Sequence, residues 1–239
     1  MANDKKTIVI LQPGYIPWLG FFNMMHSADL FIYHTDVQYD KQSWRNRNRI
    51  RTAKGFVWLT VPVQISGHSK SLIRDIRIDG GKNWRRDHLN LLKQNYMKAP
   101  FYEYYIDYFE ELYANKWEFL IDVDLEIVNY LIKELGISTK VEYSTNFDLK
   151  GLKGQDRVLA ICEQAGATEY LSGPAGKAIY FEDEFRRKGV DLAWHNYPHP
   201  VYRQQFDGFV PYLSVIDLMF NHGPESMDII DGVKMVSES

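Results

Sequence analysis

The opening strand–helix–strand pattern constrains the fold of this chain more than any other feature. Residues 7–11 form a short continuous apolar run, as expected for a strand that is buried on both faces. Residues 19–28 have helical character, and residues 29–33 form a second apolar run. A strand, a helix and a strand in this order predict a parallel pair joined by a right-handed crossover.

The later segments continue this alternation and predict an α/β fold with a mostly parallel, Rossmann-like sheet. We expect further strands at residues 57–63, 73–78, 140–144, 169–172 and 190–194. We expect helices at residues 84–97, 120–135, 156–165, 179–188 and 215–220. Because no Gly/Ser/Pro-rich linker bounds residues 84–136, we expect this helical section to pack on the sheet within a single domain, 1–239.

Charge and cysteine content narrow the functional classes. The 239 residues carry a formal net charge of −3, so no global field favours DNA or an anionic membrane. The only cysteine, Cys162, has helical spacing from Val158 and is interpreted as a small core residue. With no secretory signal at the start and no apolar run long enough for a bilayer, we expect a cytoplasmic protein.

A local basic cluster comprises Arg45, Arg47, Arg49, Arg51 and Lys54. One interpretation is a solvated edge strand with alternating arginines. The other is a lip that binds anions, because the planar guanidinium group suits phosphate.

The loop after the first strand is the first candidate site. It carries Gln12, Tyr15 and Trp18, and two prolines, Pro13 and Pro17, fix its path. Gly20 would let the backbone approach a ligand closely. The alternative is a structural elbow whose aromatic rings cover the core.

A nucleotidyltransferase-like framework is possible for this fold, but the His-x-Gly-His device of those enzymes is not present. When Gly20 is aligned with their glycine, Trp18 and Phe21 occupy the histidine positions. Indole and phenyl groups cannot donate charged hydrogen bonds to a reacting phosphate.

The second candidate site follows the second strand, where ligands commonly bind in open α/β sheets. Its members are Asp36, Gln38, Tyr39, Lys41, Trp44, Asn46, Arg47 and Asn48. Carboxylate and amide groups pair with sugar hydroxyls, and an indole offers an apolar ring face. A solvated loop is the alternative, but so many different polar groups favour a polar ligand.

Two later segments complete the candidates. Ser172, Gly173 and Lys177 follow a strand and could cradle an anion, although the spacing is not that of a Walker A motif. In the segment with His199, Tyr202 and Gln204, prolines bracket the histidine and hold it rigidly, as a general base requires. No spacing indicates a metal site or a nucleophile triad.

Seven strings together resemble the WbqC family. They are LQPGYIPWLGFF (11–22), DVQY (36–39), WRNRN (44–48), WLTVPV (58–63), YLSG (170–173), HPVYRQ (199–204) and LSVIDLMFNHG (213–223). They cover nearly the whole chain in order. Many members begin the first string with His-Gln-Pro, so the presence of Leu11 here transfers no role for that histidine.

The resemblance implies a role in bacterial O-antigen or surface-polysaccharide biosynthesis, by transfer of glycine onto an amino sugar. The acceptor is expected to be a small-molecule nucleotide amino sugar, and the donor a thioester, an aminoacyl-tRNA or an ATP-derived adenylate. An ATP-dependent amide ligase and a non-catalytic binding protein for nucleotide sugar or polysaccharide are the alternatives.

Under this hypothesis the predicted catalytic residues are His199, as general base, and Asp36. Arg47 and Lys177 would hold phosphates, and Trp18 or Trp44 would stack on sugar or base. The remaining predicted substrate-binding residues are Gln12, Tyr15, Gln38, Tyr39, Asn46, Asn48, Ser172, Gly173, Tyr202 and Gln204. A homo-oligomer is possible through the tyrosine-rich segment 102–113, although that segment could equally pack within its own chain.

Overall fold

The computed structural model describes residues 5–40, 44–64 and 71–232, which form two compact units. The first unit comprises Met1–Gln12, Asn23–Val37 and Ile137–Pro198, and the second comprises Pro13–Phe22, Gln38–Gly136 and His199–Ser239. Along the chain, one boundary between them falls inside helix α1 (Leu19–His26).

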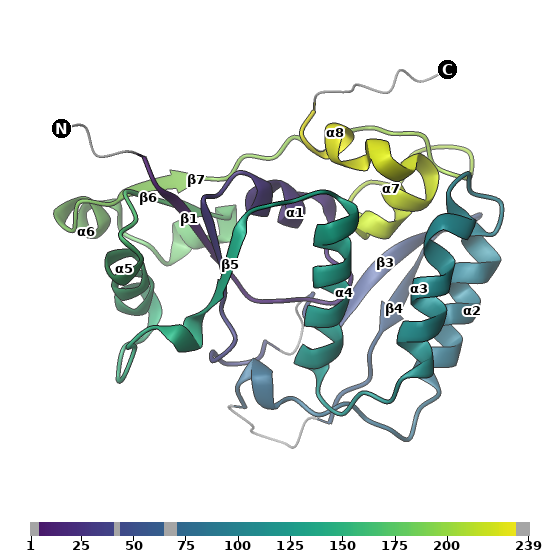
Figure 1. The fold of residues 1–239 in the computed structure, drawn as a ribbon, viewed down its shortest axis with the longest axis horizontal. Coiled ribbons are helices and arrows are strands. Elements are labelled where there is room, and N and C mark those ends of the chain that lie inside the picture. The colour runs from purple at the N-terminus through teal and green to yellow at the C-terminus, as the bar shows by residue number, and fades with distance from the viewer. Residues whose placement is uncertain (1–4, 41–43, 65–70, 233–239) are drawn as a thin grey trace. The chain divides into compact units, whose positions relative to one another are not determined.

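The first unit is built on a five-stranded parallel sheet, which confirms the α/β class (Figure 1). Its strands are β1 (Thr7–Leu11), β2 (Leu30–Tyr33), β5 (Lys140–Tyr143), β6 (Glu169–Ser172) and β7 (Asp191–Trp194). The register of the first pair sets Ile8 opposite Leu30 and Leu11 opposite Tyr33. The predicted strand–helix–strand opening is therefore confirmed.

The strand order in this sheet is β5-β2-β1-β6-β7. From the central strand β1 the chain moves outward through β2 to β5, and later fills the other side of β1 with β6 and β7. This is the strand order of doubly wound, Rossmann-like folds. The direction in which successive strands are added reverses between β1 and β6. In such sheets ligands bind beyond the carboxyl ends of the strands at that reversal.

One face of this sheet is covered by helix α5 (Gly154–Ala165), with helix α6 (Glu182–Arg187) in the same core. Alternate strand residues such as Ile8 and Ile32 share one buried core cluster with Val158 and Cys162. Cys162 is fully buried, which agrees with its interpretation as a core residue. Burial raises its thiol pKa to about 12.

The second unit combines an antiparallel hairpin with helices. The hairpin is β3 (Arg47–Thr52) and β4 (Gly55–Thr60). The helices are α2 (Trp84–Tyr96), α3 (Tyr102–Ala114), α4 (Leu120–Glu134), α7 (Val215–His222) and α8 (Ser226–Ile230). The prediction that residues 84–136 pack on the parallel sheet within one domain stays a prediction.

Two predicted elements differ from the structure. The predicted strand at 73–78 is wrong: Ile73–Asp75 is a 3-10 turn, and Ile78 forms only an isolated bridge with Val63. Its apolar alternation is satisfied by burial of Ile76 and Ile78, without a continuous ladder. The predicted helix at 179–188 is shorter, because a 3-10 turn, Pro174–Ala178, precedes α6.

A buried hydrogen-bonded cluster lies inside the second unit. The Tyr15 hydroxyl is 2.8 Å from His88 Nδ1 and 2.5 Å from the Tyr113 hydroxyl. Burial lowers the pKa of His88 to about 4, so the imidazole is neutral at physiological pH. Buried polar groups are costly unless they are paired, and these three satisfy one another.

Candidate functional site

The carboxyl edge of the parallel sheet gathers polar side chains from several strands. Gln12 follows β1, His34 and Asp36 follow β2, Ser172 ends β6, and His195 follows β7. The backbone fixes these positions, because His34 N–H donates to the Leu11 carbonyl and His195 N–H donates to the Ser172 carbonyl. This edge is the candidate site of the first unit.

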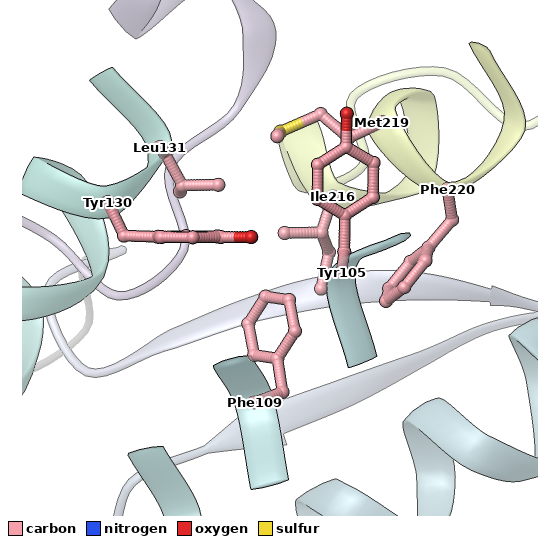
Figure 2. Close-up of a pocket in the computed structure, with 7 residues that line it drawn as sticks. All are labelled: Tyr105, Phe109, Tyr130, Leu131, Ile216, Met219 and Phe220. Atoms are coloured by element: carbon pink, nitrogen blue, oxygen red, sulfur yellow. The ribbon is translucent and has the colours of Figure 1, made fainter. Parts of the chain in front are cut away.

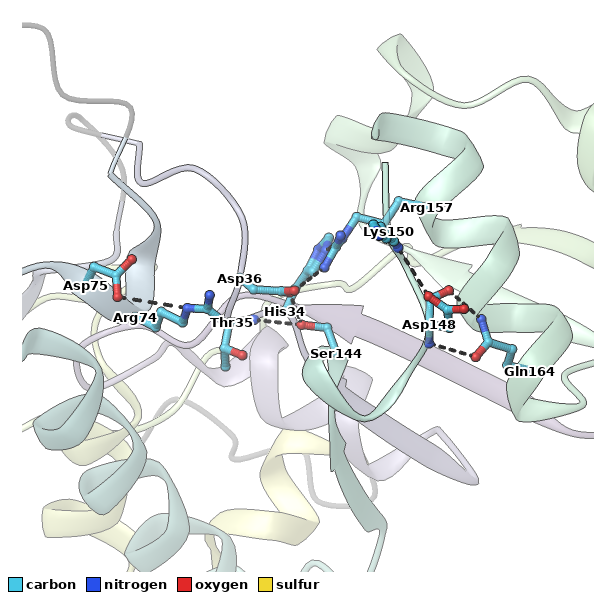
Figure 3. A network of polar contacts seen from close by, with 10 residues as sticks. All are labelled: His34, Thr35, Asp36, Arg74, Asp75, Ser144, Asp148, Lys150, Arg157 and Gln164. Carbon is cyan, nitrogen blue, oxygen red and sulfur yellow. Dashed lines mark hydrogen bonds and ion pairs between the residues drawn. The ribbon is translucent and has the colours of Figure 1, made fainter. Parts of the chain in front are cut away.

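Asp36 is held as a carboxylate by two partners (Figure 3). Arg157 Nη2, from α5, lies 2.5 Å from Oδ2, and Ser144 Oγ donates to Oδ1 at 2.5 Å. Burial raises the carboxyl pKa, but the hydrogen bonds from Arg157 and Ser144 outweigh it and bring the pKa below its ordinary value. Asp36 is therefore an ionised hydrogen-bond acceptor at neutral pH.

His34 shares the same arginine. Arg157 Nε donates to His34 Nε2 at 2.9 Å, which places the imidazole proton on Nδ1. Burial, together with the positive charge of Arg157, lowers the pKa of His34 to about 4. Arg157 thus joins two residues that follow β2 and positions both.

We expect the neutral state of His34 to make stability depend on pH. Its pKa is about 6.5 when unfolded and about 4 when folded, so the unfolded chain binds the proton more readily between these values. Stability contributed by His34 is complete above pH 6.5 and declines as the pH falls towards 4. Urea unfolding at a series of pH values measures this slope, and His34→Gln should reduce it. An unchanged slope in this variant would contradict the assignment.

His195 is the least engaged histidine at the carboxyl edge. Its Nε2 lies 2.7 Å from the Asn23 Oδ1 acceptor, so Nε2 carries the proton. Its ring stacks on Tyr197 at a centroid distance of 5.7 Å. Burial lowers its pKa below the ordinary value, and no described residue occupies its Nδ1 lone pair. This geometry leaves a neutral imidazole with one free basic nitrogen.

The predicted anion cradle also lies at this edge. Ser172 is buried, whereas Lys177 is exposed with its Nζ 5.8 Å from the Trp194 ring centroid. Gly176 allows Ser172 to lie close, because a Cβ there would stand 2.3 Å from Ser172 Oγ. Gly173 has open space at the position of a Cβ. Lys177 is thus accessible to an anion.

His199 and Trp18 belong to the second unit. The two rings stack at a centroid distance of 6.3 Å, and a Cβ on Gly20 would lie 2.3 Å from the indole. Gly20 therefore makes room for Trp18 and does not stand open to a ligand. His199 Nδ1 donates to the Pro200 carbonyl, and Nε2 accepts the Tyr212 N–H at 3.1 Å. His199 could act as a general base only after losing that hydrogen bond.

Tyr202 and Gln204 are bound to a buried carboxyl group in the second unit. The Tyr202 hydroxyl and Gln204 Nε2 donate to Asp217 Oδ2 at 2.9 and 3.0 Å. The Tyr96 hydroxyl donates to Oδ1 at 2.7 Å. The binding roles of Tyr202 and Gln204 stay predictions, and a substrate would have to displace these hydrogen bonds.

The other predicted residues of the second unit are distributed among buried and exposed positions. Asn46 and Asn48 donate to the Val61 and Ile16 carbonyls, so their amide groups support the backbone. Tyr39 is buried, and burial together with the nearby Asp124 charge raises its pKa to about 12. Gln38 is exposed and its backbone bridges to Leu72, whereas Lys41 lies outside the described residues.

Two pockets in the described chain lie away from these side chains. One, shown in Figure 2, is lined in the second unit by rings and aliphatic groups, which leave essentially no space for a water-sized molecule. Its lining residues are Tyr105, Phe109, Tyr130, Leu131, Ile216, Met219 and Phe220. With no charged group it cannot orient a charged substrate. The other, about 260 Å³, lies at the amino edge of the parallel sheet beside Lys6, Asp29 and Lys140.

Sequence reasoning missed His34, Ser144 and Arg157 as site residues, and within the candidate segment 195–204 it chose His199 as the base and not His195. The rule that selected Asp36, a polar residue directly after a buried strand, also selects His34 and His195. Arg157 had no comparable signal, because only the packing of α5 brings it to β2.

Among the described residues, no group of three or more His, Cys, Asp or Glu side chains could hold a metal ion. In the same part of the chain, no helix combines the length and apolar character needed to cross a membrane.

Comparisons with known proteins agree with the resemblance of the seven strings. The WbqC-like protein family model matches residues 12–229. The uncharacterized protein Rv1507c of Mycobacterium tuberculosis is 36% identical over 227 residues, which cover 94% of this chain and 97% of that protein. No solved structure matches significantly. The family model covers well over half of the chain, including β2 to β7 and the polar residues that follow the strands, and the chain belongs to the WbqC-like protein family.

Proposed function

We propose that this protein transfers an acyl group, with glycyl as the first candidate, to the amine of a nucleotide-linked amino sugar. The nucleotide sugar binds at the carboxyl edge of the parallel sheet. The observation that carries this proposal is the presence of ionised Asp36 at the carboxyl edge, directly after β2, the strand next to the central strand β1. A carboxylate after the second strand of such a sheet suits ribose or sugar hydroxyls.

The other groups at this edge suit the same ligand. Gln12 and Ser172 offer neutral hydrogen-bonding groups, and the exposed ammonium of Lys177 suits a diphosphate. The first βα connection lacks the G-x-G-x-x-G sequence of dinucleotide-binding sites, so a single nucleotide carrying a sugar is favoured over NAD.

We assign the general base to His195 in place of the predicted His199. An amine must lose a proton to attack an acyl donor, and His195 Nδ1 is the free basic nitrogen described at this edge. Asn23 fixes the tautomer by accepting the Nε2 proton. The new C–N bond forms as the donor's leaving group departs, and His195 takes the amine proton.

Direct attack fits better than a covalent acyl-enzyme. Cys162 is fully buried and its thiol pKa is raised to about 12 by burial, so it is not a reactive thiolate. A mechanism with one acyl transfer step requires the donor and the amine to be bound together, and predicts no burst of donor cleavage without acceptor.

We expect Asp36→Asn to weaken binding of a nucleotide amino sugar by roughly tenfold to a hundredfold, the effect of losing charge-assisted hydrogen bonds of about 1.5–3 kcal/mol. Calorimetric titration with UDP- and dTDP-linked amino sugars measures this change. Asp183→Asn on α6, an exposed carboxylate of the same unit, is the matched control and should bind normally. Equal affinity of wild type and Asp36→Asn would contradict a role of Asp36 in binding.

The same samples test the reaction class. Mass spectrometry should detect an acceptor heavier by one glycyl residue when glycyl-tRNA, glycyl thioester, or glycine with ATP is supplied. Release of AMP or ADP that requires the acceptor would identify an ATP-dependent ligase. Binding without product from every donor would identify a non-catalytic binding protein and contradict the proposed transferase.

A further inference from the structure

The β3–β4 hairpin of the second unit exposes large aromatic rings beside arginines. Trp44, Phe56 and Trp58 are 47, 46 and 38% exposed. Arg49 is paired with Trp58 in the antiparallel register, so the two side chains lie on the same face. We call Trp44, Arg47, Arg49, Phe56 and Trp58 the aromatic–arginine face.

The guanidinium groups and rings of this face lie against one another. Arg47 Cζ lies 4.7 Å from the Trp58 ring centroid, and Arg49 Cζ lies 4.7 Å from that of Phe56. The Trp44 and Trp58 rings are 5.2 Å apart. Arg49 Nη2 also donates to the Tyr212 carbonyl at 2.8 Å, which fixes its guanidinium. These contacts hold the planar groups in place before any ligand binds.

The hairpin segment is basic, although Arg51 is buried against backbone carbonyls and Arg45 lies near Asp40 and Asp124, so Arg47 and Arg49 are the cations of this face. Residues 44–63 include four arginines and one lysine but no Asp or Glu, although the whole chain has a net charge of −3. Guanidinium groups can donate to the hydroxyl oxygens of a neutral polysaccharide, but their positive charge is complementary only to an anion. The face therefore favours an anionic ligand.

Exposed rings together with cations suit a ligand that has both unstacked bases and phosphates. Bases stack on aromatic rings and on guanidinium planes, and arginines pair with the backbone phosphates. Small ligands usually bind in concave pockets, whereas these rings stand exposed along a two-stranded sheet. An extended single strand matches that shape better than a mononucleotide does.

We infer that the aromatic–arginine face binds single-stranded RNA, and that the activated donor is an aminoacyl-tRNA recognised through an unpaired segment. The choice of RNA rests on the proposed function, because of the three possible donors only aminoacyl-tRNA carries a polymer of bases and phosphates. The RNA contact itself is tested without any catalytic measurement.

The experiment is fluorescence anisotropy of a labelled, unstructured oligoribonucleotide titrated with the full chain at several salt concentrations. Trp58→Ala and Phe56→Ala should each weaken binding roughly tenfold, because each removes a stacking platform. Arg47→Gln should reduce the slope of log affinity against log salt by about 0.7, the value for one phosphate contact on a single strand. Phe181→Ala and Arg86→Gln, exposed residues elsewhere, should bind as wild type.

Three results would overturn the inference. The first is that the oligoribonucleotide does not bind at low salt. The second is that inorganic polyphosphate binds as tightly as the oligoribonucleotide and that Trp58→Ala does not change its affinity. The third is that AMP displaces the oligoribonucleotide when both are present at the same concentration. Circular dichroism checks that Trp58→Ala is folded, and Phe56→Ala tests the contribution of ring stacking independently of Trp58. Titration of the same variants with the nucleotide amino sugar separates the two proposals, because loss of RNA binding alone contradicts only this one.

Discussion

Replacing Asp217 with alanine is expected to lower the free energy of unfolding by about 3–5 kcal/mol, the effect of removing one partner from a buried charged network. Asp217 is fully buried and accepts hydrogen bonds from Tyr96, Tyr202 and Gln204. Alanine removes the acceptor that these three groups share, and Gln204 Nε2 keeps only the Val210 carbonyl. It also removes the negative charge near Arg51, whose guanidinium is itself buried.

Urea unfolding followed by circular dichroism measures this loss as a shift in midpoint. Tyr202→Phe removes a single donor and should lower the free energy of unfolding by only about 1 kcal/mol. It also keeps the test available if Asp217→Ala does not fold. An unchanged midpoint in both variants would mean that this network does not stabilise the second unit.

The Asp217 network also shows where prediction of the site from sequence stopped. Tyr202 and Gln204 occupy a proline-rich segment with mixed polar groups, which is a pattern typical of a ligand-binding loop. Their partner lies on α7, and nothing in local spacing links that carboxyl group to them. Side chains that satisfy a buried charge and side chains that bind a ligand have the same composition.

The fold was more predictable than the site. Apolar runs located β1 and β2, because strands buried on both faces need continuous apolar residues. The run at 73–78 was misassigned because Ile76 and Ile78 alternate with polar residues as in a strand. Both side chains are buried, but the segment forms only isolated bridges and no continuous ladder. The order β5-β2-β1-β6-β7 could not be derived, since a long segment separates β2 from β5 along the chain.

Positions directly after strands carried most of the information about the site. Asp36 was identified by that rule, and the rule extends to His34 and His195. Prolines on both sides of His199 favoured it as a rigid base, but rigidity does not keep a lone pair free. In the structure the Tyr212 N–H donates to His199 Nε2, and Tyr212 has a φ of 58° that non-glycine residues seldom adopt.

The two histidines therefore predict different kinetics. With the amine acceptor and the productive donor, His195→Gln should lower kcat by about 10²- to 10⁴-fold, the usual contribution of a general base. His199→Gln should stay close to wild type, because its ring nitrogens already bond the Pro200 carbonyl and the Tyr212 N–H. The reverse result would return the base to His199 and contradict the assignment to His195.

The pH profile gives a second reading of the same assignment. Burial lowers the pKa of His195, and the base must be unprotonated, so kcat/KM should fall only as the pH drops below about 6.5. Asn23→Ala removes the acceptor that fixes the Nε2–H tautomer, and it should lower kcat less than His195→Gln does. If Asn23→Ala reduced only the melting temperature and left kcat unchanged, Asn23 would be structural. Loss of the acidic limb in His195→Gln, with normal binding of the nucleotide amino sugar, would separate proton transfer from substrate binding.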